Sequence, residues 1–266
     1  MDIEKVIERL EKKKAIYQKN KNILKEDPEF IRNYEDRFLV KYTFDSTSIE
    51  GNSLTLDETR DLLMNHRTPA QKDVREIYEQ INHRNAFRFM TGRVKGGYEL
   101  NEEIVLRTHE LLVQNIFQGG NYRNNMVYIQ GSMHECPKPE ELPLLMKKFY
   151  EELENKNSVC GMPESGINPI ELACWTHCDF VSLHPFRDGN GRTSRLMMNY
   201  QLMKHGYVPV SIPVERKTEY YQALEHFHRT GDSGMFKELI CGLEEKELDF
   251  FIQREQMLMQ SIKREI

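Results

Sequence analysis

The segment that decides the fold and the chemistry is His184-Pro185-Phe186-Arg187-Asp188-Gly189-Asn190-Gly191-Arg192-Thr193-Ser194-Arg195. Apolar residues at helical spacing flank it on both sides, over residues 168–180 and 193–205. Asn168-Pro169 is a typical helix start, with Asn at the N-cap and Pro at the first helical position. We expect the first helix to end just before His184, so the segment is predicted to be a loop that leads into a helix N-terminus.

The residue types in this loop point to phosphate chemistry. Successive backbone N–H groups of Gly189-Asn190-Gly191 can form a concave anion site, to which the positive end of the following helix adds. Arg192 and Arg195 are three residues apart, so both can fork onto phosphate oxygens. Asp188 has the chemistry to hold Mg²⁺ against a diphosphate. His184 is a candidate general base near the reacting phosphorus.

Each of these residues also has an ordinary structural explanation. A single His at a helix end is often a cap, an Asp-Gly pair is often a turn, and two Arg on one helix face are often solvated. The Gly-Asn-Gly stretch is only a fragment of a dinucleotide fingerprint, because Ser194 stands at the third glycine position and no strand is expected before it. A base, an acid, an anion site and two Arg in order within one segment are harder to explain by chance.

Composition indicates a soluble helical protein. The 266 residues are 39% hydrophobic and 30% charged, with few turn residues at 15 Gly and 10 Pro, which favours helices over a sandwich or barrel. The net charge of −5 gives no cationic field for nucleic acid or membranes, so we expect neither as a partner. No apolar run has the length of a membrane span, and the start lacks a signal peptide, so a cytoplasmic location is expected.

The five cysteines form no CxxC pair and are odd in number, so we expect reduced thiols. Cys174, His177 and Cys178 could share one helical face as metal ligands. Their surroundings are apolar, however, and packing of small buried cysteines explains them better.

The rest of the chain is predicted to be helical. Apolar periodicity marks helices near the start, after Asp27-Pro28, after Thr55, from about 73 to 90, after Asn101 and after Pro139, then two short segments around 220–228 and 236–243 and a last one with Leu248 to Ile262. That last segment could pack on the body or on a second subunit. Met126-Val127-Tyr128-Ile129 before Gln130-Gly131 is expected to form a small β-hairpin. We expect three regions: 1–95, 96–232 and 233–266.

At this point the chain closely resembles the Fic family, whose signature is HPFx(D/E)GNGRxxR. Every fixed position is filled from His184 to Arg195. Gly120-Asn121-Tyr122-Arg123 with Val127 and Ile129 resembles the family's flap hairpin, and Ser46 to Glu58 resembles its N-terminal (S/T)xxxE(G/N) region. The resemblance covers roughly residues 35–232 and implies an all-α Fic fold with a small flap.

The resemblance implies protein adenylyl transfer: AMP moves from ATP to a Ser, Thr or Tyr hydroxyl of a target protein, and pyrophosphate leaves. Self-modification is a further possibility. It assigns the base to His184, Mg²⁺ to Asp188, and the anion site to Gly189, Asn190 and Gly191. Arg192 and Arg195 would hold the β and γ phosphates, while Phe186 anchors the loop in the core.

Three further roles follow from the resemblance alone. Glu50, with Ser46, would restrain the enzyme by pairing with Arg195. Tyr221 is the candidate contact for adenine. The flap would hold an extended target segment, with Ile129 as a clamp.

Other readings stay open. A phosphotransferase of the Doc kind has Lys in place of the second Gly of the loop, and Gly191 argues against it. Removal of AMP from modified proteins, with Glu50 positioning a water, keeps the same fold. A helical interaction protein with an unreactive loop is the third, which the intact His184 and Asp188 disfavour.

Overall fold

The computed structural model describes residues 3–25, 27–129 and 132–265. In this part of the chain every regular element is a helix, which confirms the all-α prediction. The α-helices are α1 (Ile3–Leu24), α2 (Pro28–Ile49), α3 (Leu56–Met64), α4 (Val74–Lys95), α5 (Glu102–Leu112), α6 (Leu142–Val159), α7 (Pro169–Leu183), α8 (Asn190–Lys204), α9 (Lys217–Thr230) and α10 (Gly234–Glu265). Short 3₁₀ turns cover Pro139–Glu141, Pro163–Ser165 and Val214–Arg216.

Helix starts follow the capping residues that the sequence displays. Asp27 accepts a hydrogen bond from the Phe30 amide at the start of α2. Thr55 and Glu58 form a complete capping box at α3, and Asn101 caps α5. Asn168 caps α7, with Pro at the first helical position. These side chains satisfy amides that a helix leaves without a partner, and so they fix where each helix begins.

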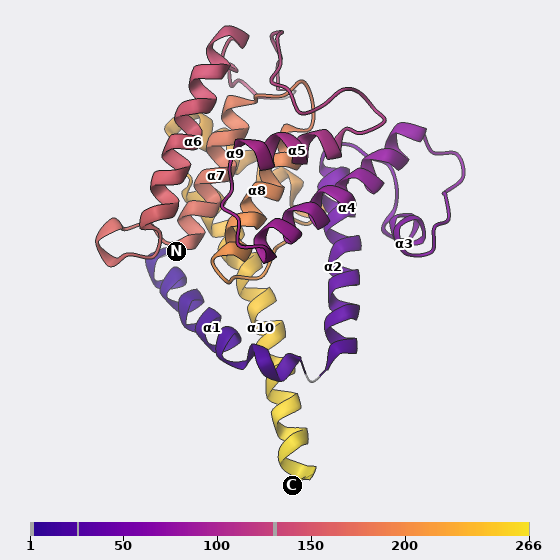
Figure 1. Ribbon diagram of the computed structural model, residues 1–266, viewed down its shortest axis with the longest axis vertical. Coiled ribbons are helices and arrows are strands. Elements are labelled where there is room, and N and C mark those ends of the chain that lie inside the picture. The colour runs from indigo at the N-terminus through magenta and orange to yellow at the C-terminus, as the bar shows by residue number, and fades with distance from the viewer. Residues whose placement is uncertain (1–2, 26, 130–131, 266) are drawn as a thin grey trace.

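The central pair of helices is α7 and α8, which pack against each other and are joined by the loop at 184–189 (Figure 1). Helices α4 and α5 pack together and against α8 of this pair, and α2 crosses beside α4. Helix α6 covers α7, while α3 stands at the edge of the molecule against α2 and α4 (Figure 1). The loop therefore lies where the N-terminal helices meet the central pair.

Two apolar cores sit on either side of this pair. One contains residues of α1, α7, α9 and α10, including fully buried Leu10 and Phe236. The other contains residues of α2, α4, α5, α6 and α7, together with Phe186 from the loop, which is fully buried. Cys174 and Cys178 lie buried in the first core as free thiols, as the packing interpretation requires.

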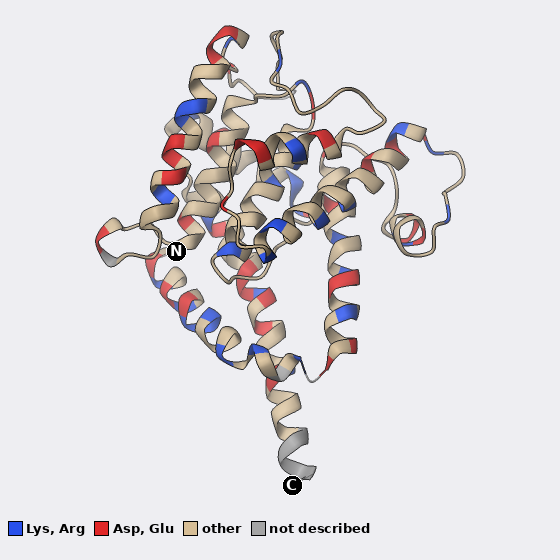
Figure 2. Ribbon diagram, in the orientation of Figure 1, with Lys and Arg blue, Asp and Glu red and all other residues tan. Residues whose placement is uncertain are grey.

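Helix α1 packs along α10, and both helices carry charged residues of both signs (Figure 2). Arg9 and Lys13 of α1 contact Glu245 of α10 at 2.6 and 2.8 Å. Within the residues described, no helix combines the length and the apolar character that a membrane span needs.

Two predictions about local structure need correction. The segments expected separately after Gly234 form one helix, α10, of 32 residues. The β-hairpin is not seen: residues 121–129 contain no strand, and Gln130 and Gly131 lie outside the described residues. Side-chain hydrogen bonds and one backbone hydrogen bond, rather than a strand ladder, hold the ends of this segment, as described below.

Candidate active site

The loop between α7 and α8 is fixed by its own side chains. Helix α7 ends at Leu183, and its C-cap, His184, has the left-handed conformation with φ 46°. The Asn190 side chain accepts from the Phe186 amide and donates to the Phe186 carbonyl, both at 2.8 Å. Asn190 therefore brackets the loop with its side chain, leaving only its backbone amide for an anion.

His109 of α5 contacts the same loop through its ring and through Nε2. Its ring stacks on Phe186 with centroids 3.7 Å apart. Its Nε2 donates to the Asp188 carbonyl at 3.0 Å, and its Nδ1 accepts from the Gly120 amide at 3.0 Å. Burial lowers the pKa of His109 to about 4, so the neutral ring can donate at one nitrogen and accept at the other.

His184 is arranged as a neutral base. Its Nδ1 lies 3.2 Å from the Val181 carbonyl, which can only accept, so Nδ1 carries the proton and the Nε2 lone pair is free. Burial lowers the pKa of His184, and this outweighs the opposing effects of the Val181 hydrogen bond and of Glu50. The ring is thus unprotonated at neutral pH.

Asp188 is an ionised carboxylate in a cationic setting. Burial on its own raises the pKa, but Arg192, the Gly189 amide and Arg75 outweigh it and hold the pKa below its usual value. Its Oδ1 accepts from the Gly189 amide at 2.6 Å and from Arg192 at 3.1 Å, and its Oδ2 accepts from Arg75 at 2.6 Å.

The N-terminus of α8 is an anion site that already faces a carboxylate. Gly189 is the N-cap in the left-handed conformation, and no side chain caps the helix. A Cβ placed on Gly191 would overlap Glu50 Oε1 and lie 3.1 Å from Arg195 Nη1. The Glu50 carboxylate therefore lies directly over Gly191, where the first-turn amides of α8 favour negative charge.

Arg195 is buried and held by the end of α2. Its Nη2 donates to Glu50 Oε1 and to the Ser46 carbonyl, both at 2.7 Å, and its Nε donates to Ser46 Oγ at 3.0 Å. Its Nη1 donates to the Tyr220 hydroxyl at 3.2 Å. The guanidinium is 1% exposed, and the Glu50 side chain is 32% exposed, so Glu50 is the partner that can move.

Arg192 is buried as well but less fully satisfied. Its Nη2 reaches Asp188, and its Nη1 lies 3.5 Å from Glu79 of α4. The Nε and Nη1 atoms of Arg192 are buried without a hydrogen-bond acceptor. Buried donors of this kind are costly unless an acceptor arrives, and a phosphate oxygen is a suitable one.

The segment expected to be the flap is tied to the loop by Arg123. Its amide donates to the Pro185 carbonyl at 2.8 Å, its Nε to the His184 carbonyl at 2.8 Å, and its Nη2 to the Pro137 carbonyl at 2.5 Å. Farther along, Ser132 donates to Glu225 of α9 at 2.6 Å. Ile129 is half-buried between these two attachments.

Tyr221 lies close to the end of α2. Its hydroxyl donates to the Ile49 carbonyl at 3.2 Å, and the residue is 40% exposed. Burial, with the nearby Glu50 carboxylate, raises the pKa of Tyr221 to about 12.

The side chains of this site could hold Mg²⁺ only if phosphate oxygens supplied further ligands. Among the described residues there is no group of three or more His, Cys, Asp or Glu side chains that could hold a metal ion. Mg²⁺ commonly takes one carboxylate plus phosphate and water oxygens. Asp188, ionised at the mouth of an anion site, is suited to that arrangement.

Sequence reasoning brought together His184, Asp188, Arg192, Arg195, Glu50 and Ser46, and the structure places them around one loop. It missed His109, Arg75 and Glu79, all from helices of the N-terminal half. Each stands in a stretch of ordinary amphipathic helix, so the sequence carries no separate signal for them.

Comparison with known proteins agrees with this geometry. A model of the Fic/DOC family matches residues 99–202. The protein adenylyltransferase Fic of Drosophila persimilis is 32% identical over 234 residues, which are 87% of this chain and 44% of that protein. This chain thus spans under half the length of that curated relative.

Two solved structures are similar in fold. A Fic domain containing signaling protein from Bacteroides thetaiotaomicron superposes with a TM-score of 0.80 at 24% identity, covering 92% of this chain and 97% of that one. A fragment of Fic-1 from C. elegans superposes with a TM-score of 0.74 at 26% identity, covering 95% of this chain and 73% of that one.

Proposed function

The chain belongs to the Fic/DOC family, and from that premise we propose that it is a protein adenylyltransferase that moves AMP from ATP to a hydroxyl side chain of a target protein. The observation that carries the proposal is the loop itself. It combines a neutral His184, an ionised Asp188, and an uncapped helix N-terminus flanked by two buried arginines.

In the proposed reaction, the target's Ser, Thr or Tyr oxygen forms a bond to the α-phosphorus, and the bond between that phosphorus and the bridging oxygen to the β-phosphate breaks. His184 Nε2 takes the hydroxyl proton as the oxygen attacks. Pyrophosphate leaves with the bridging oxygen and its electron pair. The Val181 carbonyl keeps the imidazole in the tautomer that this step needs.

The remaining loop residues bind and orient the nucleotide. The amides of Gly189, Asn190 and Gly191 would receive phosphate oxygens, and Arg192 and Arg195 would hold the β and γ phosphates. Asp188 would hold Mg²⁺, which neutralises charge on the α and β phosphates when it is bound.

We further propose that Glu50 restrains this activity. Arg195 Nη2 is engaged by Glu50 and by the Ser46 carbonyl, so it cannot at the same time fork onto a γ-phosphate. The Glu50 carboxylate also lies over Gly191, in the space that a phosphate oxygen would use. ATP would then bind with its triphosphate displaced and its α-phosphorus misaligned.

We propose that elements next to the loop bind the target protein and the nucleoside. The segment held by Arg123 would act as the flap, adding an extended target segment by main-chain hydrogen bonds with Ile129 as a clamp. Tyr221 of α9 would contact adenine. Residues 1–95 would serve as the regulatory region, 96–232 as the catalytic core and 233–266 as its C-terminal support. Self-modification and a homo-oligomer remain proposals of the same kind.

The test uses purified protein, Mg²⁺ and cell lysate with ATP labelled at either the α or the γ phosphate. Transfer of α-label but not γ-label to protein, seen with Glu50→Gly and absent from Glu50→Gly/His184→Ala, supports AMP transfer. Transfer of γ-label instead would identify a phosphotransferase. No transfer by any variant, together with release of AMP from a pre-labelled protein by the wild type, would identify the reverse reaction as the activity.

A further inference from the structure

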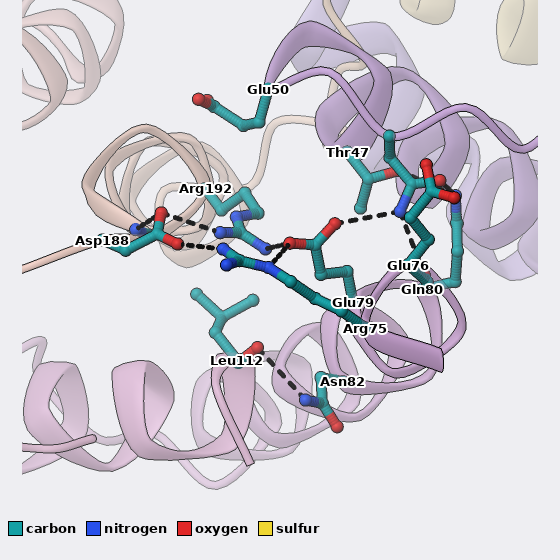
Figure 3. Close-up of polar contacts among 12 residues, drawn as sticks. Thr47, Glu50, Arg75, Glu76, Glu79, Gln80, Asn82, Leu112, Asp188 and Arg192 are labelled. Atoms are coloured by element: carbon teal, nitrogen blue, oxygen red, sulfur yellow. Dashed lines mark hydrogen bonds and ion pairs between the residues drawn. The ribbon is translucent and has the colours of Figure 1, made fainter. Parts of the chain in front are cut away.

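Four charged side chains beside the loop form a closed ring of alternating sign (Figure 3). Arg75 donates to Asp188 Oδ2 at 2.6 Å and, through Nε, to Glu79 Oε1 at 3.1 Å. Arg192 donates to Asp188 Oδ1 at 3.1 Å, and its Nη1 lies 3.5 Å from the same Glu79 oxygen. Figure 3 shows the two arginines side by side, with Asp188 at one end and Glu79 at the other.

Both carboxylate oxygens of Asp188, the residue proposed to bind Mg²⁺, accept hydrogen bonds from members of the ring. Asp188 Oδ1 is shared by the Gly189 amide and Arg192, both of which belong to the loop and α8. Asp188 Oδ2 is engaged by Arg75, which comes from the first turn of α4. A cation that binds Asp188 Oδ2 must therefore displace the Arg75 guanidinium from this oxygen.

Arg75 is the member of the ring that is free to leave. Its side chain is 57% exposed, whereas that of Arg192 is 3% exposed. Glu79 contacts Arg75 through Oε1 and is fixed through Oε2 by Asn52 at 3.0 Å. An Arg75 side chain displaced from Asp188 keeps Glu79 as its partner, so no buried charge is left unpaired.

We propose that Arg75 is a built-in cation that competes with the divalent metal for Asp188, and that it sets how much the metal contributes to nucleotide binding. This inference rests on the proposed function, because it requires Asp188 to be the metal ligand. Arg75 occupies Oδ2 while the metal is absent and must swing toward Glu79 when the metal and the triphosphate arrive. It is a positioning residue and takes no part in the chemical step.

The mechanism also joins the metal site to the segment that carries Glu50. Asn52 stands two residues after Glu50, and it contacts both Glu79 and, through Oδ1, the Gln80 side chain of α4. The carboxylate that receives Arg75 is thus held by the same turn that presents Glu50 to Arg195. Two arginines of the proposed nucleotide site therefore contact carboxylates from the N-terminal half. Glu50, before this turn, contacts Arg195, and Glu79, which Asn52 holds, lies beside Arg192.

The test measures binding rather than turnover, with AMPPNP as a non-hydrolysable probe and Mn²⁺ as the metal. Calorimetry gives the affinity for AMPPNP in EDTA and then in saturating Mn²⁺, and the ratio of the two is the gain from the metal. Arg75→Met keeps the aliphatic stem and removes the charge. Arg75→Lys keeps the charge and serves as the matched control.

Arg75→Met should raise the gain from Mn²⁺ about twofold to fivefold, because a partly exposed cation no longer has to be displaced. Its affinity for AMPPNP in EDTA should stay near that of the wild type, and Arg75→Lys should resemble the wild type in both measurements. An unchanged gain in Arg75→Met would overturn the inference. So would a matching loss of affinity in EDTA, which would make Arg75 a phosphate ligand instead.

Asp188→Asn separates this inference from the function on which it rests. If the metal lies on Asp188, this variant loses the gain from Mn²⁺. A gain equal to that of the wild type would remove the metal from Asp188, and the proposed function would fail at that point together with the inference. Loss of the gain in Asp188→Asn, with no change in Arg75→Met, would overturn the inference alone.

Discussion

Replacing Glu50 by glycine should raise AMP transfer by one to two orders of magnitude. The change removes the carboxylate that contacts Arg195 Nη2 at 2.7 Å and lies over Gly191. Arg195 keeps the Ser46 carbonyl, Ser46 Oγ and the Tyr220 hydroxyl as partners. The guanidinium therefore stays in place, with one donor released for a γ-phosphate.

The magnitude follows from the contact that ATP must break. A hydrogen bond between charged groups contributes about 1.5–3 kcal/mol, and each 1.4 kcal/mol is about tenfold in an equilibrium constant. Glu50 is 32% exposed, so solvent screening favours the lower part of that range, roughly tenfold to fiftyfold. A triphosphate misplaced by about 1 Å can cost on the order of 10²-fold in rate, which sets the upper limit.

The assay is the initial rate of α-label transfer, including self-modification, with Glu50→Gln as the matched variant. Glutamine keeps the size of the side chain and removes its charge, so it should fall between wild type and glycine. Circular dichroism and thermal unfolding check that each variant is folded. Equal rates for the wild type and folded Glu50→Gly would refute the restraint, because the carboxylate would then have no bearing on the triphosphate.

Four other outcomes follow from the site. His184→Ala in the Glu50→Gly background should lower transfer by ~10²–10⁴-fold while leaving AMPPNP binding nearly unchanged, and near-normal labelling would exclude it as the base. Asp188→Asn should lower Mg²⁺-dependent transfer by on the order of 10²-fold or more, and undiminished turnover would make Asp188 a turn residue only. Because burial lowers the pKa of His184, the unprotonated base should persist on acidification until the pH is below ~6.5, and a rate that falls off already above pH 7 would contradict this. Burial lowers the pKa of His109 to about 4 in the folded protein, whereas the pKa of a histidine in the unfolded chain is ~6.5. Because the unfolded chain binds the proton first, the free energy of unfolding should decline as the pH falls from ~6.5 to 4. Urea titrations of His109→Phe should find a shallower decline.

The helices could be predicted from the sequence because their ends are marked by local chemistry. Asp27, Thr55, Asn101 and Asn168 each cap a helix with their own side chain. The prediction divided the C-terminal helix because its apolar residues fall into two groups, around 236–243 and from Leu248 to Ile262. Gly242 lies in the first group. An interior glycine costs a helix only about 1 kcal/mol, and packing of α10 against α1, α7 and α9 outweighs it.

The expected hairpin is not seen in the described residues, for a different physical reason. Alternating residues around Val127 fit a strand, but a strand needs a partner ladder, and the structure instead shows isolated hydrogen bonds at the ends of this segment, most of them from side chains. Arg123 holds its start to the His184 and Pro185 carbonyls, and Ser132 holds its far side to Glu225. Periodicity carries no information about such contacts, since they join residues far apart in the chain.

The loop was readable because its chemistry is contiguous in sequence, whereas the residues that control it are not. Arg75 and Glu79 are one helical turn apart on α4 and meet Asp188 and Arg192 only after the chain has folded. A motif therefore identifies the groups that are proposed to bind phosphate, but not the side chains that contact those groups in the free protein. Here the occupants are of opposite kinds: the carboxylate of Glu50 lies at the proposed anion site over Gly191, and the guanidinium of Arg75 contacts the proposed metal ligand Asp188. On the proposed function each of them takes the place of one part of a metal-bound triphosphate. The complete ligand would then displace both at once, whereas phosphate or metal alone would displace only one.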